Sequence, residues 1–81
     1  MELDRLLDAV TDEATFIAFV DALRSDLRTD EGSWVNGSIE EFLEAALAWG
    51  GTTNMGASQG LANTSPWRRC AEFLYCGKMY E

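Results

Sequence analysis

The sequence predicts an all-α protein, a small bundle of three to four helices with a long glycine-rich loop before the last helix, formed by a single domain over residues 1–81. Apolar residues recur at the spacing of a helical face, two serine-led helix starts precede apolar runs, and strand-like alternation never exceeds four residues. The chain is shorter than most domains and buries a proportionally small core. Its 47% hydrophobic and 11% aromatic content still indicates a folded chain rather than a disordered one.

The first two helices are expected in the N-terminal third. A short helix is predicted over about residues 2–9, where four apolar residues share one face: Leu3, Leu6, Leu7 and Val10. Thr11, followed by the acidic Asp12 and Glu13, is the expected cap of a second helix that extends to about Arg28. Its apolar face, which we expect to be buried, consists of Phe16, Ile17, Phe19, Val20, Leu23 and Leu27.

The third helix is expected after a turn-forming segment over residues 29–37 that Trp34 anchors. Ser38 and Glu41 have the spacing of a capping box, so the helix is predicted to begin at Ile39. The terminating signal is the pair Gly50-Gly51. The predicted buried stripe of this helix is Ile39, Phe42, Leu43, Ala46 and Leu47, with Trp49 beside it.

A flexible loop without regular structure is predicted over residues 50–65, because four glycines and small polar residues dominate that segment. Such a loop is either functional or a tolerated insertion, and we favour insertion because no phosphate-binding motif is present. Ser65-Pro66 then predicts the cap and first residue of the last helix. This helix is apolar around much of its circumference and is expected at the centre of the fold. Gly77 within it either admits a close neighbour or ends the helix early.

The charge is strongly acidic and uneven. The net charge is −8, and residues 1–45 alone carry twelve acidic and three basic residues, a net of −9. This field repels phosphate backbones and steers the protein towards basic surfaces. Direct binding of nucleic acid is therefore disfavoured. The simpler alternative is that the acidic surface only keeps the protein soluble.

The residue types needed for most catalysis are missing. The chain has no histidine, so Ser-His and Cys-His catalysis are excluded, and no enzymatic activity is expected. Cys70 and Cys76 lie about 240° apart around one helix, cannot pair there, and lack the spacing of a zinc site. We expect buried free thiols, no metal and no cofactor. Without a membrane-spanning run or a signal peptide pattern, the expected location is cytoplasmic and away from membranes.

Size, charge and missing chemistry together indicate a non-catalytic protein-binding module of the immunity, antitoxin or inhibitor type, which presents an acidic face to a basic partner protein. The alternative is a structural subunit that self-associates as a homodimer through apolar surface near Trp67 and Tyr75. Helix capping and core anchoring are the simpler roles for the same side chains. The candidate partner-binding residues are Asp12, Glu13, Asp30, Glu31, Trp34, Asn36, Trp67 and Tyr75.

Several short motifs together resemble those of a known family. They are Phe19-Val20, Leu23, Asp26, Trp34-Val35-Asn36, Phe42-Leu43-Glu44-Ala45, Trp49, Trp67, Ala71, Leu74-Tyr75, Lys78 and Tyr80-Glu81. Over roughly residues 16–81 the chain resembles a family of small bacterial proteins of unknown function, and it departs from that pattern at residues 50–65 and at Cys76. The resemblance implies a helical fold and a bacterial or phage origin, and it brings no activity. It also suggests that the Asn36 side chain satisfies a buried backbone group beside Trp34.

Overall fold

The computed structural model describes residues 3–79 and contains four α-helices and two short 3₁₀ helices within that range. In chain order they are α1 Leu3–Asp8, α2 Glu13–Thr29, η1 Glu31–Ser33, α3 Ile39–Thr53, η2 Ala57–Gln59 and α4 Pro66–Met79. No strand occurs among residues 3–79, and the predicted small all-α bundle is confirmed. The expectations for Glu2, Tyr80 and Glu81 lie outside the described residues.

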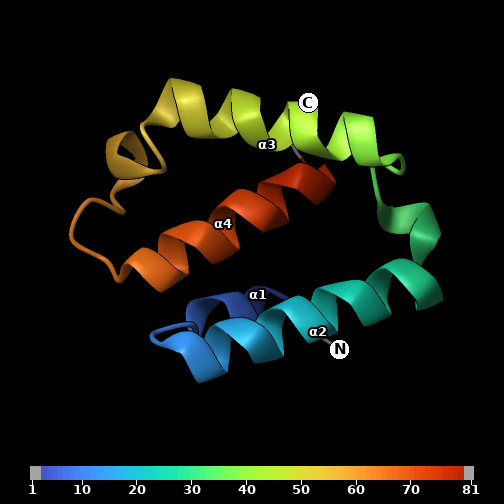
Figure 1. The fold of residues 1–81 in the computed structure, drawn as a ribbon, viewed down its shortest axis with the longest axis horizontal. Helices are drawn as coiled ribbons and strands as arrows, with labels where there is room; N and C mark the ends of the chain where they lie inside the picture. The colour runs from blue at the N-terminus through green and yellow to red at the C-terminus, as the bar shows by residue number, and fades with distance from the viewer. Residues whose placement is uncertain (1–2, 80–81) are drawn as a thin grey trace.

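Three helices lie side by side in the order α3, α4, α2, and α1 packs against α2 and α4 (Figure 1). The molecule measures 33 × 26 × 16 Å along its principal axes and is therefore much thinner in one direction than in the others. As predicted for a central element, α4 contacts the other three α-helices. No Cα atom of α2 lies within 8 Å of a Cα atom of α3, so α4 separates these two helices.

The helix starts largely follow the predicted capping chemistry. The Ser38 hydroxyl accepts from the Glu41 N–H at 3.1 Å, and the Ser65 hydroxyl accepts from the Trp67 N–H at 3.1 Å. Only this half of the capping box predicted for Ser38 and Glu41 is formed, because the Glu41 carboxylate accepts from the Ser38 hydroxyl rather than from its backbone N–H. The cap of α2 is Asp12, so the prediction of Thr11 is wrong by one residue. The reason is Thr15, which completes a capping box with Asp12: each side chain accepts from the other residue's backbone N–H, at 2.9 and 3.0 Å.

Buried side chains form two packed regions that meet at α4. The first lies among α1, α2 and α4 and contains Leu3, Leu7, Val10, Phe19, Ala22, Leu23 and Ala71. The second lies where α3 meets α4 and the turns around η2, and there α3 buries Ala45, Ala46 and Trp49. Small residues thus dominate the buried side of α3, which allows its backbone to approach α4.

Two glycines make that approach possible. A Cβ atom on Gly77 of α4 would lie 2.7 Å from the ring of Phe42 on α3. A Cβ atom on Gly50 of α3 would lie 3.1 Å from the ring of Phe73 on α4. Each helix therefore receives an aromatic ring of the other over a glycine. Of the two roles predicted for Gly77, close approach is the one observed, since α4 continues to Met79.

The prediction that Gly50-Gly51 ends the third helix is wrong. Helix α3 continues to Thr53, because Gly50 lies under the Phe73 ring and serves packing rather than termination. Its C-cap is Asn54, whose φ of 53° is left-handed and whose N–H donates to the Gly50 carbonyl. Residues 50–53 are thus helical, and the residues after Asn54 form η2 and a series of hydrogen-bonded turns.

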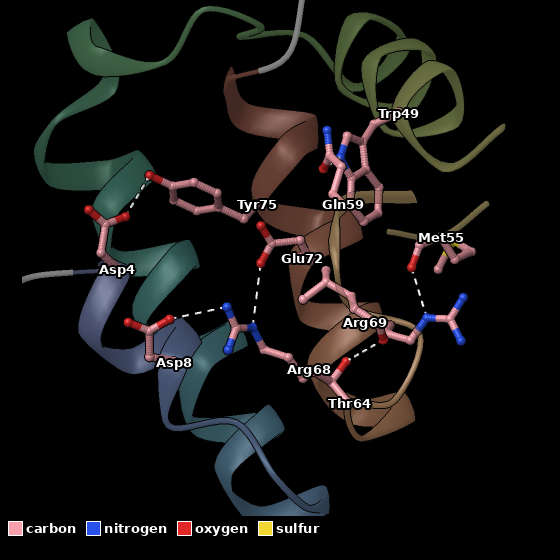
Figure 2. Close-up of polar contacts among 11 residues, drawn as sticks. Asp4, Asp8, Trp49, Met55, Gln59, Thr64, Arg68, Arg69, Glu72 and Tyr75 are labelled. Atoms are coloured by element: carbon pink, nitrogen blue, oxygen red, sulfur yellow. Dashed lines mark hydrogen bonds and ion pairs between the residues drawn. The ribbon is translucent and has the colours of Figure 1, made fainter. Parts of the chain in front are cut away.

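Polar bonds tie these turns to α3 and α4 (Figure 2). The Arg69 guanidinium donates to the carbonyls of Asn54 and Met55, both at 2.8 Å. The Trp49 indole N–H donates to the Gln59 side chain at 3.0 Å. The prediction that residues 50–65 lack regular structure is therefore wrong. They include the end of α3, the helix η2 and hydrogen-bonded turns, and side chains of α3 and α4 bond to these turns.

Candidate functional site

One flank of α3 exposes large apolar side chains. Ile39, Leu43 and Leu47 follow one another at four-residue spacing and so share this flank. Their exposed fractions are 81%, 50% and 66%. The predicted buried stripe is wrong for these three residues, whereas Ala46 is buried and Phe42 half-buried. The physical reason is that α4 and η2 are the only described helices that α3 contacts, so its second apolar flank meets no helix.

An apolar groove opens between α2 and α3, with α4 as its floor. It consists of two hollows of about 310 and 420 Å³, and Leu74 of α4 lines both. Nearly all of the accessible surface of the two hollows is apolar. The apolar lining comes from Phe16, Val20, Leu23 and Leu27 of α2, from Trp34 and Met55 of the connecting segments, from Ile39 and Phe42 of α3, and from Cys70, Phe73 and Leu74 of α4. We call these two adjoining hollows together the groove.

The two rims of the groove differ in charge. Beside the exposed apolar flank of α3 stand Glu40 and Glu44, both exposed, and α3 contains no basic residue. On the α2 rim, Ile17 is 58% exposed, so the prediction that it is buried is wrong. It lies one turn before Asp21, which pairs with Arg24 at 2.8 Å. The α3 rim is therefore negative, and the α2 rim carries both signs.

Asp26, Trp34 and Lys78 form a polar clamp at one end of the groove. The Asp26 carboxylate accepts hydrogen bonds of 2.8 Å from both the Trp34 indole and the Lys78 ammonium. The side chains of Asp26 and Lys78 are only 14% and 9% exposed. The hydrogen bond from Lys78 lowers the pKa of Asp26 below its usual value. The ammonium also lies 5.6 Å from the centre of the Trp34 ring, so all three side chains hold one another.

The segment around Asn36 fastens this clamp to the end of α4. The Asn36 amide donates to the carbonyl of buried Gly77 at 3.2 Å, which confirms the predicted role for this side chain. The backbone N–H groups of Val35 and Asn36 both donate to the Lys78 carbonyl, at 3.1 and 3.3 Å. The Trp34 ring then stacks on Phe42 with 6.0 Å between centroids. One wall of the groove is fixed by these contacts.

Another flank of α4 carries polar contacts to α1 (Figure 2). The Tyr75 hydroxyl donates to Asp4 at 2.9 Å, and Arg68 pairs with Asp8 at 3.1 Å and with Glu72 at 3.5 Å. Burial, together with the bond to Asp4, raises the pKa of Tyr75 to about 12. These contacts hold α1 against α4, and α1 contributes no residue to the groove lining.

A polar hollow of about 300 Å³ lies beside the clamp and includes Asp4, Asp26, Asp30, Tyr75 and Lys78. Four of these side chains already bond to one another across it, as the Asp4–Tyr75 and Asp26–Lys78 pairs. Within residues 3–79, no three or more Cys, Asp or Glu side chains are grouped so as to hold a metal ion. Over the same residues, no helix has the length and apolar content to cross a bilayer.

The two cysteines are free thiols at different depths. Cys70 lines the second hollow of the groove and is exposed, so the prediction that it is buried is wrong. Cys76 is half-buried and lines neither hollow, and burial raises its pKa to about 11. Cys70 is therefore a natural probe of the groove, and Cys76 is an internal reference.

The acidic residues predicted to bind a partner do not form one surface. Asp12 caps α2, and the hydrogen bond from the Thr15 backbone lowers its pKa. Glu13 follows in the first turn, whereas Asp30 is the C-cap of α2 and Glu31 begins η1. The seventeen residues of α2 separate the two acidic pairs by about 25 Å.

Of the other four predicted residues, two line the groove, one lies next to a lining residue, and one joins two helices. Trp34 and Asn36 line the first hollow. Trp67 is 40% exposed, with its ring 5.4 Å from that of Phe16, which lines the second hollow. Tyr75 turns towards Asp4 on α1 instead.

The exposed flank of α3 is what the sequence interpretation missed. A signal for it exists in the sequence: apolar side chains cover a wider arc of this helix than one neighbouring helix can bury. That arc consists of Ile39, Phe42, Leu43, Ala45, Ala46, Leu47 and Trp49.

A protein-family model described as a family of unknown function, DUF7660, matches residues 12–81. The matched region contains α2, α3 and α4, which are the three helices that form the groove. The comparisons with curated proteins and with solved structures gave no match. The chain belongs to the DUF7660 family, in agreement with the predicted resemblance to a family of unknown function.

Proposed function

We propose that this member of the DUF7660 family is a non-catalytic protein-binding module and that the groove is its binding surface. The observation that carries the proposal is a continuous exposed apolar surface: Ile39 lines an apolar hollow that the described chain leaves open, and the exposed Leu43 and Leu47 follow it on the same flank of α3. Contiguous apolar surface of this kind is typical of sites where proteins meet. Complete burial of one such side chain by a partner contributes roughly 1.5–3 kcal/mol.

The charge of the protein supports a basic partner. A net charge of −8 attracts basic surfaces from a distance and raises the rate of encounter, while apolar contacts supply most of the binding energy. An immunity, antitoxin or inhibitor role fits a small acidic protein that works by occupying a surface of a basic protein. In this proposal the groove makes the contact, rather than the separated acidic pairs at the two ends of α2.

The surroundings of the titratable groups support a role without catalysis. Asp26, Tyr75 and Cys76 have shifted pKa values, and the first two are engaged in contacts that join helices. A general acid or base needs a side chain directed at a substrate. The groove lining is instead apolar, with the Arg24 side chain at its rim.

A second candidate function, self-association as a structural subunit, is favoured by the same exposed flank of α3. The charge opposes it, because two copies that each carry a net charge of −8 repel one another.

Photocrosslinking from within the groove tests the proposed function. The Cys76→Ser variant carries a benzophenone probe on Cys70, and a matched control carries it on Ala9→Cys in a background where both cysteines are serine. Ala9 is exposed and follows α1, which lines neither hollow. In an extract of the source cells we expect a protein adduct from Cys70 and none from position 9. No adduct at Cys70, or the same adducts from both positions, would contradict the proposal, and an adduct of two 9.0 kDa chains would assign self-association instead.

A further inference from the structure

We infer that the occupant of the groove is an amphipathic helix of a partner protein with basic residues along the edge that faces α3. This inference rests on the proposed function and specifies the chemistry of the partner.

The lining of the groove selects a helix over an extended segment. Although Arg24, Asn36 and Ser38 are among the lining residues, the surface that the groove offers to an occupant is almost entirely apolar. An extended peptide would bury backbone N–H and C=O groups there without partners, at a cost of roughly 1–3 kcal/mol for each buried group. A helix satisfies these groups internally and presents only side chains to the groove. Residues 3–79 also contain no strand edge to which an extended peptide would add.

The dimensions of the groove agree with a helix laid along α4. The floor helix has 14 residues, which corresponds to about 21 Å, or roughly four helical turns. The two hollows adjoin at Leu74, near the middle of this floor, and reach Ile39 at one end and Met55 at the other. A docked helix would contact α2 on one side and α3 on the other, with Leu74 beneath it. The docked helix would then pack as in a helical bundle, where side-chain ridges fit into grooves and neighbouring helix axes lie about 8–10 Å apart.

Charge on the rim sets the chemistry of the partner. Glu40 and Glu44 lie one turn apart beside the exposed apolar flank of α3, and no basic residue of that helix offsets them. Lys or Arg on the facing edge of a docked helix would meet these carboxylates at the solvent-exposed margin of the contact. A second copy of the chain fits less well, because two copies that each carry a net charge of −8 repel one another, and α3 has no basic residue to meet Glu40 and Glu44 of the other copy.

The test uses three synthetic peptides of about 18 residues, which form a helix of about 27 Å. The first is an amphipathic Leu/Lys helix, the second is a Leu/Glu helix with the same leucine positions, and the third is a Leu/Lys peptide with a scrambled order. Affinity is measured by fluorescence anisotropy. Occupancy of the groove is measured by the alkylation rate of Cys70 relative to Cys76 in the same molecule.

We expect the Leu/Lys helix to bind at least about ten-fold more tightly than the Leu/Glu helix at low salt, with the difference shrinking as salt rises. It should slow alkylation of Cys70 and leave Cys76 unchanged, and the scrambled peptide should protect neither thiol. The Glu40→Gln/Glu44→Gln double variant should lose about three-fold or more of the preference for the basic helix. The matched Asp30→Asn/Glu31→Gln variant, with the same change in charge outside the groove, should retain it.

The remaining outcomes separate the two proposals. Equal protection of Cys70 by the basic and the acidic helix would retain the groove as a binding surface and refute a basic partner. Protection by none of the peptides would refute both proposals. Protection of Cys70 that increases with protein concentration in the absence of peptide would assign the groove to a second copy of the chain. If the Asp30→Asn/Glu31→Gln variant lost the preference for the Leu/Lys helix, the basic residues of the partner would contact the end of α2 rather than α3, which would refute the inference.

Discussion

The two flanks of α3 differ in what they contribute to the protein. On the packed flank Ala45, Ala46 and Trp49 are at most 6% exposed, whereas on the open flank Ile39 and Leu47 are 81% and 66% exposed. The packed flank uses small residues and one tryptophan to hold α3 close to α4. The open flank carries larger aliphatic side chains that bury little surface within the chain. The comparison shows that the amount of apolar surface on a helix does not identify the side on which its stability depends.

Truncation on the two flanks should give very different losses of stability. Trp49→Ala removes a buried ring and its indole bond to Gln59, so we expect the free energy of unfolding to fall by about 3–5 kcal/mol. Leu47→Ala on the same helix should cost less than about 1 kcal/mol, because Leu47 is already 66% exposed. Urea unfolding followed by circular dichroism measures both. Similar losses for the two variants would mean that the open flank is part of the core.

A second contrast lies between the clamp and an exposed ion pair on the same helix. Asp26→Asn leaves the Lys78 ammonium 9% exposed without a carboxylate, so the expected loss is about 3 kcal/mol. Asp21→Asn breaks the Asp21–Arg24 pair of the same 2.8 Å length, where both side chains are about two-thirds exposed. That loss should stay below about 1 kcal/mol. Equal losses for the two variants would contradict the structural role of the clamp.

The clamp also predicts the direction of a pH effect. Since the folded-state pKa of Asp26 lies below its unfolded value, its contribution is present above about pH 4 and is lost as the pH falls through the folded pKa. The wild-type protein should therefore lose stability more steeply in acid than Asp26→Asn. Urea titrations between neutral pH and about pH 2.5 measure the difference, and parallel pH curves would contradict it.

The close approach of α3 and α4 predicts a smaller effect that depends on its partner. Gly77→Ala places a Cβ atom 2.7 Å from the Phe42 ring, and we expect a loss of about 1–3 kcal/mol. In Phe42→Leu the same glycine substitution should cost less, because the smaller side chain leaves room. A double-mutant cycle measures this coupling. Independent costs at the two positions would show that the helices do not meet as described.

The smallest effect is expected at the most exposed position of the open flank. Ile39→Ser changes a side chain that is 81% exposed, and the thermal midpoint should move by no more than about 2–3 °C. Differential scanning calorimetry measures this shift. A larger decrease would indicate that Ile39 is covered in the folded protein.

Local sequence patterns predicted most of the helical frame. Ser38 and Ser65-Pro66 mark helix starts because the chemistry of a cap is confined to a few neighbouring residues. The end of α3 was not predictable from local sequence. Gly50 makes room for the ring of Phe73, which is 23 residues away in the sequence, and does not end the helix. The Asp26–Lys78 pair joins residues 52 apart and has no local signal.

The groove itself was not predicted, for a related reason, although two of its lining residues were among the candidates. Periodicity shows which residues of α3 share an arc, but the number of helices that cover the arc depends on topology. Trp34 and Asn36 were identified from their residue types in a short motif, and both line the groove. The exposure of Leu43 and Leu47 follows from the separation of α2 and α3 by α4, which no local pattern encodes.

Binding and stability measured together in one variant of the open flank show whether this flank serves a partner or the core. Leu43→Ser changes a residue that is 50% exposed on that flank. We expect the dissociation constant for the Leu/Lys helix to rise at least about ten-fold while the urea midpoint of unfolding stays close to that of the wild-type protein. Unchanged binding by a folded variant, or a loss of stability of several kcal/mol, would show that the open flank of α3 is not a surface kept for a partner.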